Sequence, residues 1–502
     1  MTSPAELALP DWLDAATLSH PNTLALTFAD NRWTYSELHQ SVNQSASILT
    51  QAVASFQGRV GILSANRPGF VFAVHAATRM MVPFVPLNWR QTSEEIAWQL
   101  QDASVTVLVV DDEHFALAAA ASASLPVNIV SIEDLERAPD VSGTENCART
   151  IDLGQEAAVV YTSGTSGRPK GARISYGNLW FSAIGSMLHL GHRRSDIWLA
   201  ALPLFHVGGL SILFRAAIGA LPVVLHERFD PAPMLAALDD GATLVSVVPT
   251  MLQRMLDVRG GTSWPPTVRC VLVGGSSTPS RLIDECLRLS IPVAPTYGLT
   301  ESASQATTLL PDEAASRPTS SGLPFPLTQV RVAIRSGEAM PGEIGSIEVR
   351  GPTLFRGYLS EDDERSGITP DGWFQTGDAG YVDPEGYLYI VDRRDDLIIS
   401  GGENIYPSEI ERILREHPSV ADVGVIGWAD ESWGSRPVAA VVWQGDPAIA
   451  IDELIVHSQE HLATYKIPDH ILLLDKLPRS PSGKLLRHVL REQIQEMVEY
   501  PG

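Results

Sequence analysis

One short stretch of the sequence combines hydroxyl, glycine and basic residues in the pattern of a phosphate-binding loop. Residues 161–173 read YTSGTSGRPKGAR and directly follow the apolar run 157–160. Glycines let a backbone approach phosphate closely, and its N–H groups and a nearby lysine can hold the anion. In the P-loop of nucleotide hydrolases, lysine directly follows the last glycine and precedes Ser or Thr. Here Lys170 follows Pro169 and precedes Gly171, so the pattern predicts phosphate chemistry of another kind, with a flexible surface loop as the alternative.

A second stretch places an arginine in apolar surroundings. Arg215 lies within LSILFRAAIGALPVV (210–224), where an unpaired guanidinium would be costly, so we expect a carboxylate partner. That partner is either an acid of this chain or a bound molecule. His206 lies nine positions earlier, which at about 100° per residue puts the two side chains on opposite sides of a regular helix. The two would then address opposite ends of a ligand.

Short apolar runs separated by segments of helix length recur between residues 60 and 300. The runs are VGIL (60–63), VTVLVV (105–110), VNIVSI (127–132), IWLAALPL (197–204), TLVSVV (243–248) and VRCVLV (268–273). Such runs predict mostly parallel sheets with helices on both faces, in which ligands bind beyond the carboxyl ends of the strands. We therefore expect an α/β fold, with a helix from about Ser175 to Leu190 after the glycine-rich loop.

The pattern changes again after residue 318. Glycine-punctuated strand patterns such as EIGSIEVRG (343–351) predict a small antiparallel or barrel-like section that completes a large domain, residues 1–394. Residues 395–502 have a pattern of their own. It predicts a helix that begins at Pro407, strands at 420–427 and 436–443, and a terminal helix at 484–497. This is enough for a small α+β C-terminal domain.

Composition excludes several classes of protein. The chain has 502 residues, 44% of them apolar and 19% charged, which is typical of a globular enzyme. Its formal net charge of -23 disfavours a broad nucleic-acid-binding face. Without a basic leader or a run of about 18 apolar residues, we expect no membrane insertion. Three widely spaced cysteines, Cys147, Cys270 and Cys286, favour a cytoplasmic location. The sequence leaves open whether the chain forms a homo-oligomer.

Seven segments along nearly the whole chain resemble, in order, those of the adenylate-forming superfamily of acyl-CoA synthetases, adenylation domains and luciferases. They are YTSGTSGRPKG (161–171), PLFHVGG (203–209), VGGSS (273–277), TYGLTES (296–302), GWFQTGD (372–378), VDRRDDLIISGGENIYPSEIE (391–411) and PSGK (481–484). The resemblance implies that an acid attacks the α-phosphate of ATP, pyrophosphate leaves, and a thiol then attacks the acyl-adenylate. ATP, Mg²⁺, CoA and a carboxylic acid are the small-molecule partners it implies.

The resemblance also implies roles for individual residues in the ATP half of the reaction. The implied ATP- and phosphate-binding residues are Thr162, Ser163, Gly164, Thr165, Ser166, Lys170, Gly274, Gly275, Tyr297, Thr300, Asp378 and Arg393. Among them, Tyr297 would stack on adenine, beside space left by the two glycines, and Asp378 would accept hydrogen bonds from the ribose hydroxyls. Glu301 would hold Mg²⁺, which a hard carboxylate suits. The implied catalytic residues are Lys484, His206 and Glu301.

Further implied residues serve the acid, the thiol and a domain movement. The acid-binding set is His206, Arg215, Gly298 and Ser302, and the CoA-tunnel set is Gly401, Gly402 and Trp433. Asp395 would be the hinge about which a mobile C-terminal domain rotates between the half-reactions. Where the family often has Gly-Arg before this hinge, the chain has Asp392-Arg393.

The acid is predicted more narrowly from FHVGGLSILFR (205–215) and TESASQATTL (300–309), which resemble the o-succinylbenzoate–CoA ligases of menaquinone biosynthesis. In that family the corresponding arginine binds the carboxylate that does not react. Three alternatives stay open: another aryl- or acyl-CoA ligase with a structural Arg215, a stand-alone adenylation enzyme that loads a carrier protein, and a silent binding protein that retains the fold.

Overall fold

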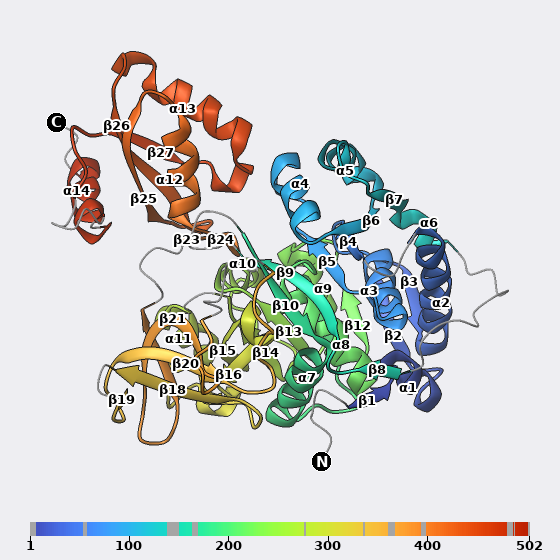
Figure 1. The fold of residues 1–502 in the computed structure, drawn as a ribbon. Helices are drawn as coiled ribbons and strands as arrows, with labels where there is room; N and C mark the ends of the chain where they lie inside the picture. Colours follow the sequence, from blue (N-terminus) through green and yellow to red (C-terminus); the bar gives the residue numbers. More distant parts are fainter. Residues whose placement is uncertain are drawn as a thin grey trace. The chain divides into compact units, whose positions relative to one another are not determined.

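Figure 1 shows the fold of the chain in a computed structural model. The structure describes residues 7–53, 58–137, 150–162, 169–275, 278–334, 337–359, 367–392, 398–478, 485 and 487–499. The chain divides into two compact units, which we describe separately. The first comprises residues 1–89, 95–161 and 171–391, and the second comprises 90–94, 162–170 and 392–502. The boundary predicted after residue 394 lies outside the described residues and stays a prediction.

The first sheet has six strands in the order β10, β9, β5, β4, β6, β7. Its strands are β4 (Arg59–Leu63), β5 (Phe84–Leu87), β6 (Val105–Val110), β7 (Asn128–Ser131), β9 (Glu156–Thr162) and β10 (Lys170–Ser175). β4 pairs in parallel with β5 and β6, β5 with β9, and β6 with β7. A separate antiparallel pair joins β1 (Ala8–Pro10) to β8 (Thr150–Asp152).

The second sheet has nine strands in the order β17, β16, β15, β14, β13, β11, β12, β2, β3. They are β2 (Leu24–Phe28), β3 (Asn31–Thr34), β11 (Trp198–Ala200), β12 (Val223–Leu225), β13 (Leu244–Val247), β14 (Cys270–Val273), β15 (Val293–Leu299), β16 (Ser304–Thr308) and β17 (Leu323–Pro324). The six from β15 to β2 run parallel, and antiparallel strands close each edge.

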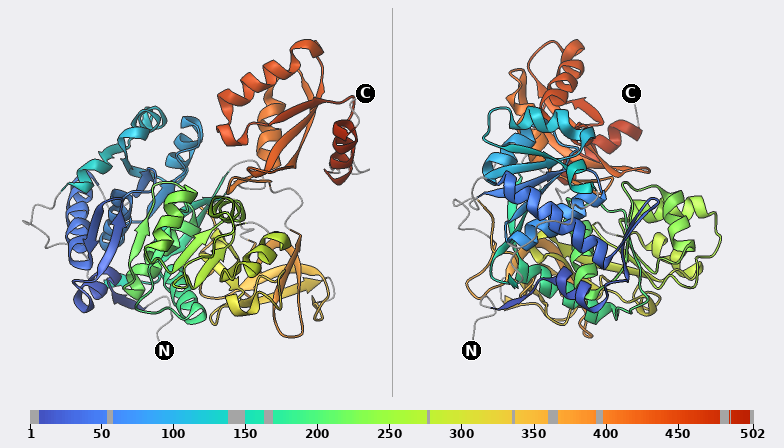
Figure 2. Two further views of the ribbon diagram at one scale, coloured as in Figure 1. Left: turned by 180° about the vertical axis from the view of Figure 1, so that it is seen from behind. Right: turned by 90° about the vertical axis from the view of Figure 1, so that its right-hand side faces the viewer.

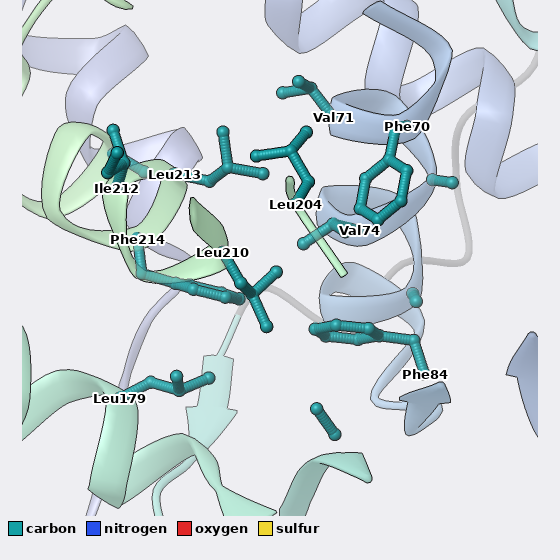
Figure 3. Close-up of a cluster of buried hydrophobic side chains, with 14 of the residues drawn as sticks. Phe70, Val71, Val74, Phe84, Leu179, Leu204, Leu210, Ile212, Leu213 and Phe214 are labelled. Atoms are coloured by element: carbon teal, nitrogen blue, oxygen red, sulfur yellow. The ribbon is translucent and has the colours of Figure 1, made fainter. Parts of the chain in front are cut away.

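Helices cover both faces of these two sheets, as the views in Figures 1 and 2 show. They are α1 (Trp12–Ser19), α2 (Tyr35–Ala52), α3 (Pro68–Met80), α4 (Ser93–Asp102), α5 (Phe115–Ser122), α6 (Ile132–Glu136), α7 (Tyr176–Leu190), α8 (Val207–Gly219), α9 (Pro231–Asp239), α10 (Pro249–Arg259) and α11 (Ser280–Arg288), with short 3-10 turns at Asp112–His114, Thr300–Ser302 and Pro311–Glu313. The largest core cluster includes residues of α3 and α8. Figure 3 shows Phe70, Val71 and Val74 of α3 facing Leu210 and Leu213 of α8.

A third sheet of the first unit has five strands in the order β19, β18, β20, β21, β22. The strands are β18 (Gln329–Ile334), β19 (Gly337–Glu338), β20 (Gly345–Arg350), β21 (Phe374–Val382) and β22 (Leu388–Asp392). β18 pairs antiparallel with β19 and β20, and β20 pairs antiparallel with β21. Of the two arrangements predicted for this section, the antiparallel one is found, and the described strands form an open sheet instead of a closed barrel.

The second unit has a sheet with helices on both faces. Its elements are β23 (Ile398–Ser400), β24 (Glu403–Ile405), β25 (Val420–Asp430), β26 (Gly434–Trp443), β27 (His470–Leu473), α12 (Pro407–Glu416), α13 (Pro447–His461) and α14 (Arg487–Glu499), with a 3-10 turn at Thr464–Lys466. Alternate residues of β25 and β26 join two clusters, one with α12 and α13 and the other with α14. Figure 1 shows α12 and α13 on one side of this sheet and α14 on the other. Successive side chains of a strand point to opposite faces of its sheet, so a strand covered on both faces has apolar residues facing each side in turn.

The predicted α/β class is confirmed. The helix expected near Ser175–Leu190 is α7, and the helix expected from Pro407 is α12. The apolar run 197–204 was predicted as one strand, but β11 ends at Ala200 because the chain turns before Pro203 toward α8. In the part of the chain that the structure describes, no helix is both long and apolar enough to cross a membrane.

Candidate active site

The predicted phosphate loop connects two strands of the six-stranded sheet. β9 ends at Thr162 and β10 begins at Lys170, and the Thr162 hydroxyl donates to the Lys170 carbonyl oxygen at 3.4 Å. β9 pairs in parallel with β5, and the carboxyl ends of parallel strands are where α/β folds bind ligands. Ser163, Gly164, Thr165 and Ser166 lie outside the described residues, so their roles stay predictions.

Two of the predicted nucleotide-binding residues contact each other. Tyr297 lies in β15 and Asp378 in β21, and the tyrosine hydroxyl donates to Asp378 Oδ2 at 2.6 Å. Both side chains are buried, and the ring of Tyr297 belongs to a small apolar cluster with Ala306 and Leu388. Gly274 and Gly275 follow β14, and the Gly274 N–H donates to Val247 at 3.1 Å. Tyr297 and Asp378 therefore form a hydrogen-bonded pair of fixed geometry. This pair suits a role in packing as well as a role in nucleotide binding.

Glu301 lies in the short turn between β15 and β16. Its Oε1 accepts a hydrogen bond from the Tyr358 hydroxyl at 2.7 Å, and its carbonyl oxygen accepts one from the Phe355 N–H at 2.8 Å. These contacts fix a carboxylate in the turn that also contains Thr300. Oxygen donors of this kind suit Mg²⁺.

The two residues that flank this turn have clear structural roles. A Cβ on Gly298 would lie 1.8 Å from the Ser304 carbonyl oxygen, so the crossing of β15 and β16 requires glycine there. Ser302 is fully buried, and its hydroxyl lies within 3.1 Å of the Leu299 and Ser304 carbonyl oxygens. Their predicted contact with the acid stays a prediction.

His206 immediately precedes α8, as the N-cap residue. It is half-buried, and its ring packs against Phe205 with centroids 4.6 Å apart. Asn66 holds the segment before it. Asn66 Oδ1 accepts from the Leu204 N–H at 2.8 Å, and Nδ2 donates to the Leu202 carbonyl at 3.0 Å. The start of α8 is therefore anchored to a neighbouring loop.

Arg215 lies in α8 with only 2% of its surface exposed. Its Nη2 donates to Ser304 Oγ at 3.2 Å, and its guanidinium carbon lies 5.5 Å from the ring centroid of Trp198. Nε is buried without a hydrogen-bond partner, and no Asp or Glu of the described residues forms an ion pair with Arg215. Burial lowers the pKa of the guanidinium to about 9, so it remains charged at neutral pH. A structural ion pair within the chain finds no support in this part of the molecule.

His192 is a candidate that the sequence reasoning missed. It follows Gly191, the left-handed cap of α7, and its ring meets Trp198 edge-on with centroids 5.4 Å apart. Both ring nitrogens are buried without hydrogen-bond partners. Burial, and then the charge of Arg215, lower its pKa to about 4, so the imidazole is neutral. Its polar stretch, GHRRSD (191–196), is typical of an exposed turn, and only the tertiary contact with Trp198 reveals the burial.

The predicted CoA-tunnel residues lie in the second unit. Gly401 has φ of +58°, its N–H donates to the Trp433 carbonyl at 2.8 Å, and a Cβ on it would lie 2.5 Å from the Trp433 ring. Gly402 follows it, and Trp433 is 48% exposed. The structure thus places the backbone of Gly401 directly against the exposed indole ring of Trp433, with no room for a side chain between them. Three further predicted residues, Arg393, Asp395 and Lys484, lie outside the described residues.

Comparisons with known proteins extend this description. The profile of the AMP-binding enzyme family matches residues 13–359, and that of the AMP-binding enzyme C-terminal domain matches residues 409–484. The 2-succinylbenzoate–CoA ligase of Bacillus cytotoxicus is 39% identical over 490 residues, which cover 97% of this chain and 99% of that enzyme.

Solved structures of the o-succinylbenzoate CoA synthetase of Bacillus subtilis are also similar. A double mutant bound to the product analogue OSB-NCoA superposes with a TM-score of 0.91 at 36% identity, over 97% of this chain and 99% of that one. The complex with the acyl-adenylate intermediate OSB-AMP gives 0.74 at 36% identity, over 97% and 98%. The complex with ATP and magnesium also gives 0.74 at 36%, over 97% and 100%.

Proposed function

Since this chain belongs to the AMP-binding enzyme family, we propose that it is an AMP-forming acid–thiol ligase that joins 2-succinylbenzoate to CoA. The superfamily predicted from the sequence is confirmed. ATP, Mg²⁺ and CoA are the partners that the complexes of the Bacillus subtilis enzyme support.

The reaction has two steps. A carboxylate oxygen of the acid bonds to the α-phosphorus of ATP while the bond to pyrophosphate breaks, which gives the acyl-adenylate. The CoA sulfur then bonds to the acyl carbon while the bond to AMP breaks, and the thiol proton passes to solvent. Lys170 and the loop before it would hold the negative charge that develops on pyrophosphate. Each preorganised donor at such a site contributes about 3 kcal/mol.

Tyr297 and Asp378 would bind the nucleoside. The hydrogen bond from the tyrosine hydroxyl to Oδ2 fixes the orientation of the carboxylate, which then offers its remaining lone pairs to the ribose hydroxyls. Glu301 would hold Mg²⁺ through the carboxylate that Tyr358 orients. The ion would neutralise charge on the phosphates when bound.

The observation that carries the choice of acid is Arg215, a buried cation with no carboxylate partner among the described residues. 2-Succinylbenzoate has two carboxylates, and only one is activated. The other would complete the coordination of Arg215, with Ser304 beside it. Monocarboxylic acids cannot do both, because their one carboxylate is consumed in the reaction. A charge-assisted, bidentate pair is the strong form of this contact.

His192 would complete the same recognition site. A neutral imidazole offers one N–H donor and one acceptor, and both nitrogens of His192 lack partners. Placed against the same indole as Arg215, it would donate a hydrogen bond to the unreacted end of the acid. His206, at the start of α8, would lie nearer the reacting carboxylate.

The remaining roles belong to the second half-reaction. Lys484 would bridge the acid and the α-phosphate during adenylation, and rotation about Asp395 would then bring Gly401, Gly402 and Trp433 to the pantetheine arm. We therefore propose domains at 1–394 and 395–502. Lys484→Ala should abolish adenylate formation but leave CoA transfer from supplied acyl-adenylate largely intact, and loss of both half-reactions would contradict this scheme.

A panel of acids tests the choice of substrate. Pyrophosphate release with CoA present would be measured for 2-succinylbenzoate, for 4-oxo-4-phenylbutanoate, which lacks the ring carboxylate, and for 2-butanoylbenzoate, which lacks the chain carboxylate. We expect the dicarboxylic acid to be the best substrate. A better monocarboxylic substrate would refute the acid while leaving the family intact. Because the reaction consumes ATP and CoA, we also propose a cytoplasmic location, which fractionation of the source cells would test.

A further inference from the structure

A cluster of metal-ligating side chains lies on α13 of the second unit and shares no residue with the sites assigned above. The helix ends in the sequence HSQEH, residues 457–461. His457, Glu460 and His461 each offer a ligand atom, and these atoms lie within 4.8 Å of one another. Residues three and four positions apart share one face of a helix, so the three side chains converge without any rearrangement of the backbone.

The hydrogen bonds of the two histidines fix which ring nitrogens are available. His457 Nε2 lies 2.9 Å from the carbonyl oxygen of Ile413, and His461 Nδ1 lies 2.9 Å from the carbonyl oxygen of His457. A carbonyl oxygen only accepts, so each of these nitrogens must carry hydrogen. The lone pairs are therefore on Nδ1 of His457 and Nε2 of His461. A histidine that binds a metal through one ring nitrogen usually donates the N–H of the other to a group such as a backbone carbonyl, as both of these histidines do.

The hydrogen bond from His457 to Ile413 fixes the position of the cluster relative to α12. Ile413 lies in the last turn of α12, where carbonyl groups lack partners within the helix, and the His457 N–H satisfies one of them. The His457 and His461 rings are 4.5 Å apart between centroids and tilted by 40°. His457 also meets His417 at 5.4 Å, and His417 stacks on Trp443. The donor set is therefore attached to the core of the unit through α12.

We propose that His457, Glu460 and His461 bind a divalent transition metal ion of the zinc class, with a fourth position left to water. Two imidazoles and one carboxylate suit Zn²⁺, Co²⁺ or Ni²⁺, whereas Mg²⁺ prefers an all-oxygen set. The site is distinct from the magnesium position proposed at Glu301. A bound ion would join two turns of α13 and, through His457, brace α12 against unfolding.

The test uses the tag-free, metal-free full chain. Titration with Zn²⁺ in the presence of excess Mg²⁺ should show one saturable equivalent, and Co²⁺ should give the visible absorption of a four-coordinate complex. His461→Gln and Glu460→Gln should each weaken Zn²⁺ binding, the former by about tenfold or more. Zn²⁺ should raise the melting temperature of the parent chain but not that of His461→Gln.

Matched controls separate this site from other histidines. His470, 70% exposed at its side chain and in the same unit, should bind no ion, so His470→Gln should leave the titration unchanged. His457→Gln is less decisive, because it also alters the contact with Ile413. The proposal is overturned if the parent chain shows no saturable Zn²⁺ binding, or if both His461→Gln and Glu460→Gln bind Zn²⁺ as the parent does.

Discussion

Two buried arginines of the first unit lie on helices that contribute to the same core cluster, part of which Figure 3 shows. Their surroundings differ. Arg79 of α3 and Arg215 of α8 are each 2% exposed. Arg79 contacts the carboxylate of Asp14 directly, has Asp11 at 3.5 Å and donates to the Asn43 side chain. Arg215 has one hydrogen bond, to a serine hydroxyl, and a buried Nε without a partner.

The difference is between a charge that the chain pairs with its own carboxylates and a charge that the described residues leave without one. Breaking a buried ion pair costs more than replacing both of its partners, because the remaining charge is left unsolvated. Around Arg79 the chain supplies the opposite charge itself. Around Arg215 the described residues supply none, and in the function proposed above the second carboxylate of the acid would offset the cost of burial. Unsatisfied groups of this kind concentrate at functional sites.

The largest expected effect is on catalysis. Arg215→Met should lower kcat/KM for 2-succinylbenzoate by about 10³-fold, because a buried charge pair contributes about 3–5 kcal/mol and about 1.4 kcal/mol is tenfold. Steady-state kinetics of pyrophosphate release would measure it. Activity with 4-oxo-4-phenylbutanoate should be almost unchanged, and the free energy of unfolding should not fall. An equal loss with both acids would show that Arg215 does not read the second carboxylate.

Arg79→Met should give the opposite pattern. It leaves Asp11 buried, and burial already raises the pKa of that carboxyl despite the opposing charge of Arg79. We expect the free energy of unfolding to fall by about 3 kcal/mol, measured by urea denaturation, with little change in the preference among acids. If Arg79→Met instead lost activity selectively with the dicarboxylic acid, the two arginines would not differ in role.

A histidine beside each arginine predicts how stability depends on pH. Burial, and then the charges of Arg79 and Arg215, lower the pKa values of His75 and His192 to about 4. The unfolded chain takes up protons near pH 6.5 while the folded chain does not, so stability is lost as pH falls from 6.5 toward 4. Between pH 7 and pH 5, the free energy of unfolding of His192→Phe should fall by about 2 kcal/mol less than that of the parent chain.

The same comparison is sharper with ligand present. A bound carboxylate would favour the protonated form of His192, where Arg215 and Arg269 now disfavour it and Asp196 favours it. Saturating 2-succinylbenzoate should therefore reduce the loss of stability at low pH that is due to His192. It should leave the loss that is due to His75 unchanged, as the variants His192→Phe and His75→Phe would show. Equal protection against both losses would mean that the acid binds elsewhere.

The smallest expected effect concerns the hydroxyl that contacts Arg215. Ser304→Ala removes one hydrogen bond to a charged group, so kcat/KM for the dicarboxylic acid should fall about tenfold. Ser304 has φ of +101°, and Ser304→Gly should lose the same activity while gaining stability of about 1 kcal/mol. Matching stabilities for the two variants in thermal melts would indicate that this conformation carries no strain.

Much of the fold followed from local patterns, while the environments of single side chains did not. Runs of Val, Ile and Leu predicted the parallel strands, and Pro407 marked the start of α12. The apolar neighbours of Arg215 predicted its burial because they lie on the same helix. His192 could not be recognised, since Trp198 buries it from another element. Likewise Tyr297 and Asp378 were predicted separately, but their hydrogen bond joins strands 81 residues apart in sequence.

The tight crossing of β15 and β16 has a consequence for redesign of the proposed acid-binding site. Because any side chain at Gly298 would collide with the Ser304 carbonyl, that position cannot be varied without displacing the strand that presents Ser304 to Arg215. A library aimed at new acids should keep Gly298 fixed and vary Arg215, His192 and Ser304 together. An aliphatic pair at 215 and 192 would be the starting point for converting the enzyme to monocarboxylic acids.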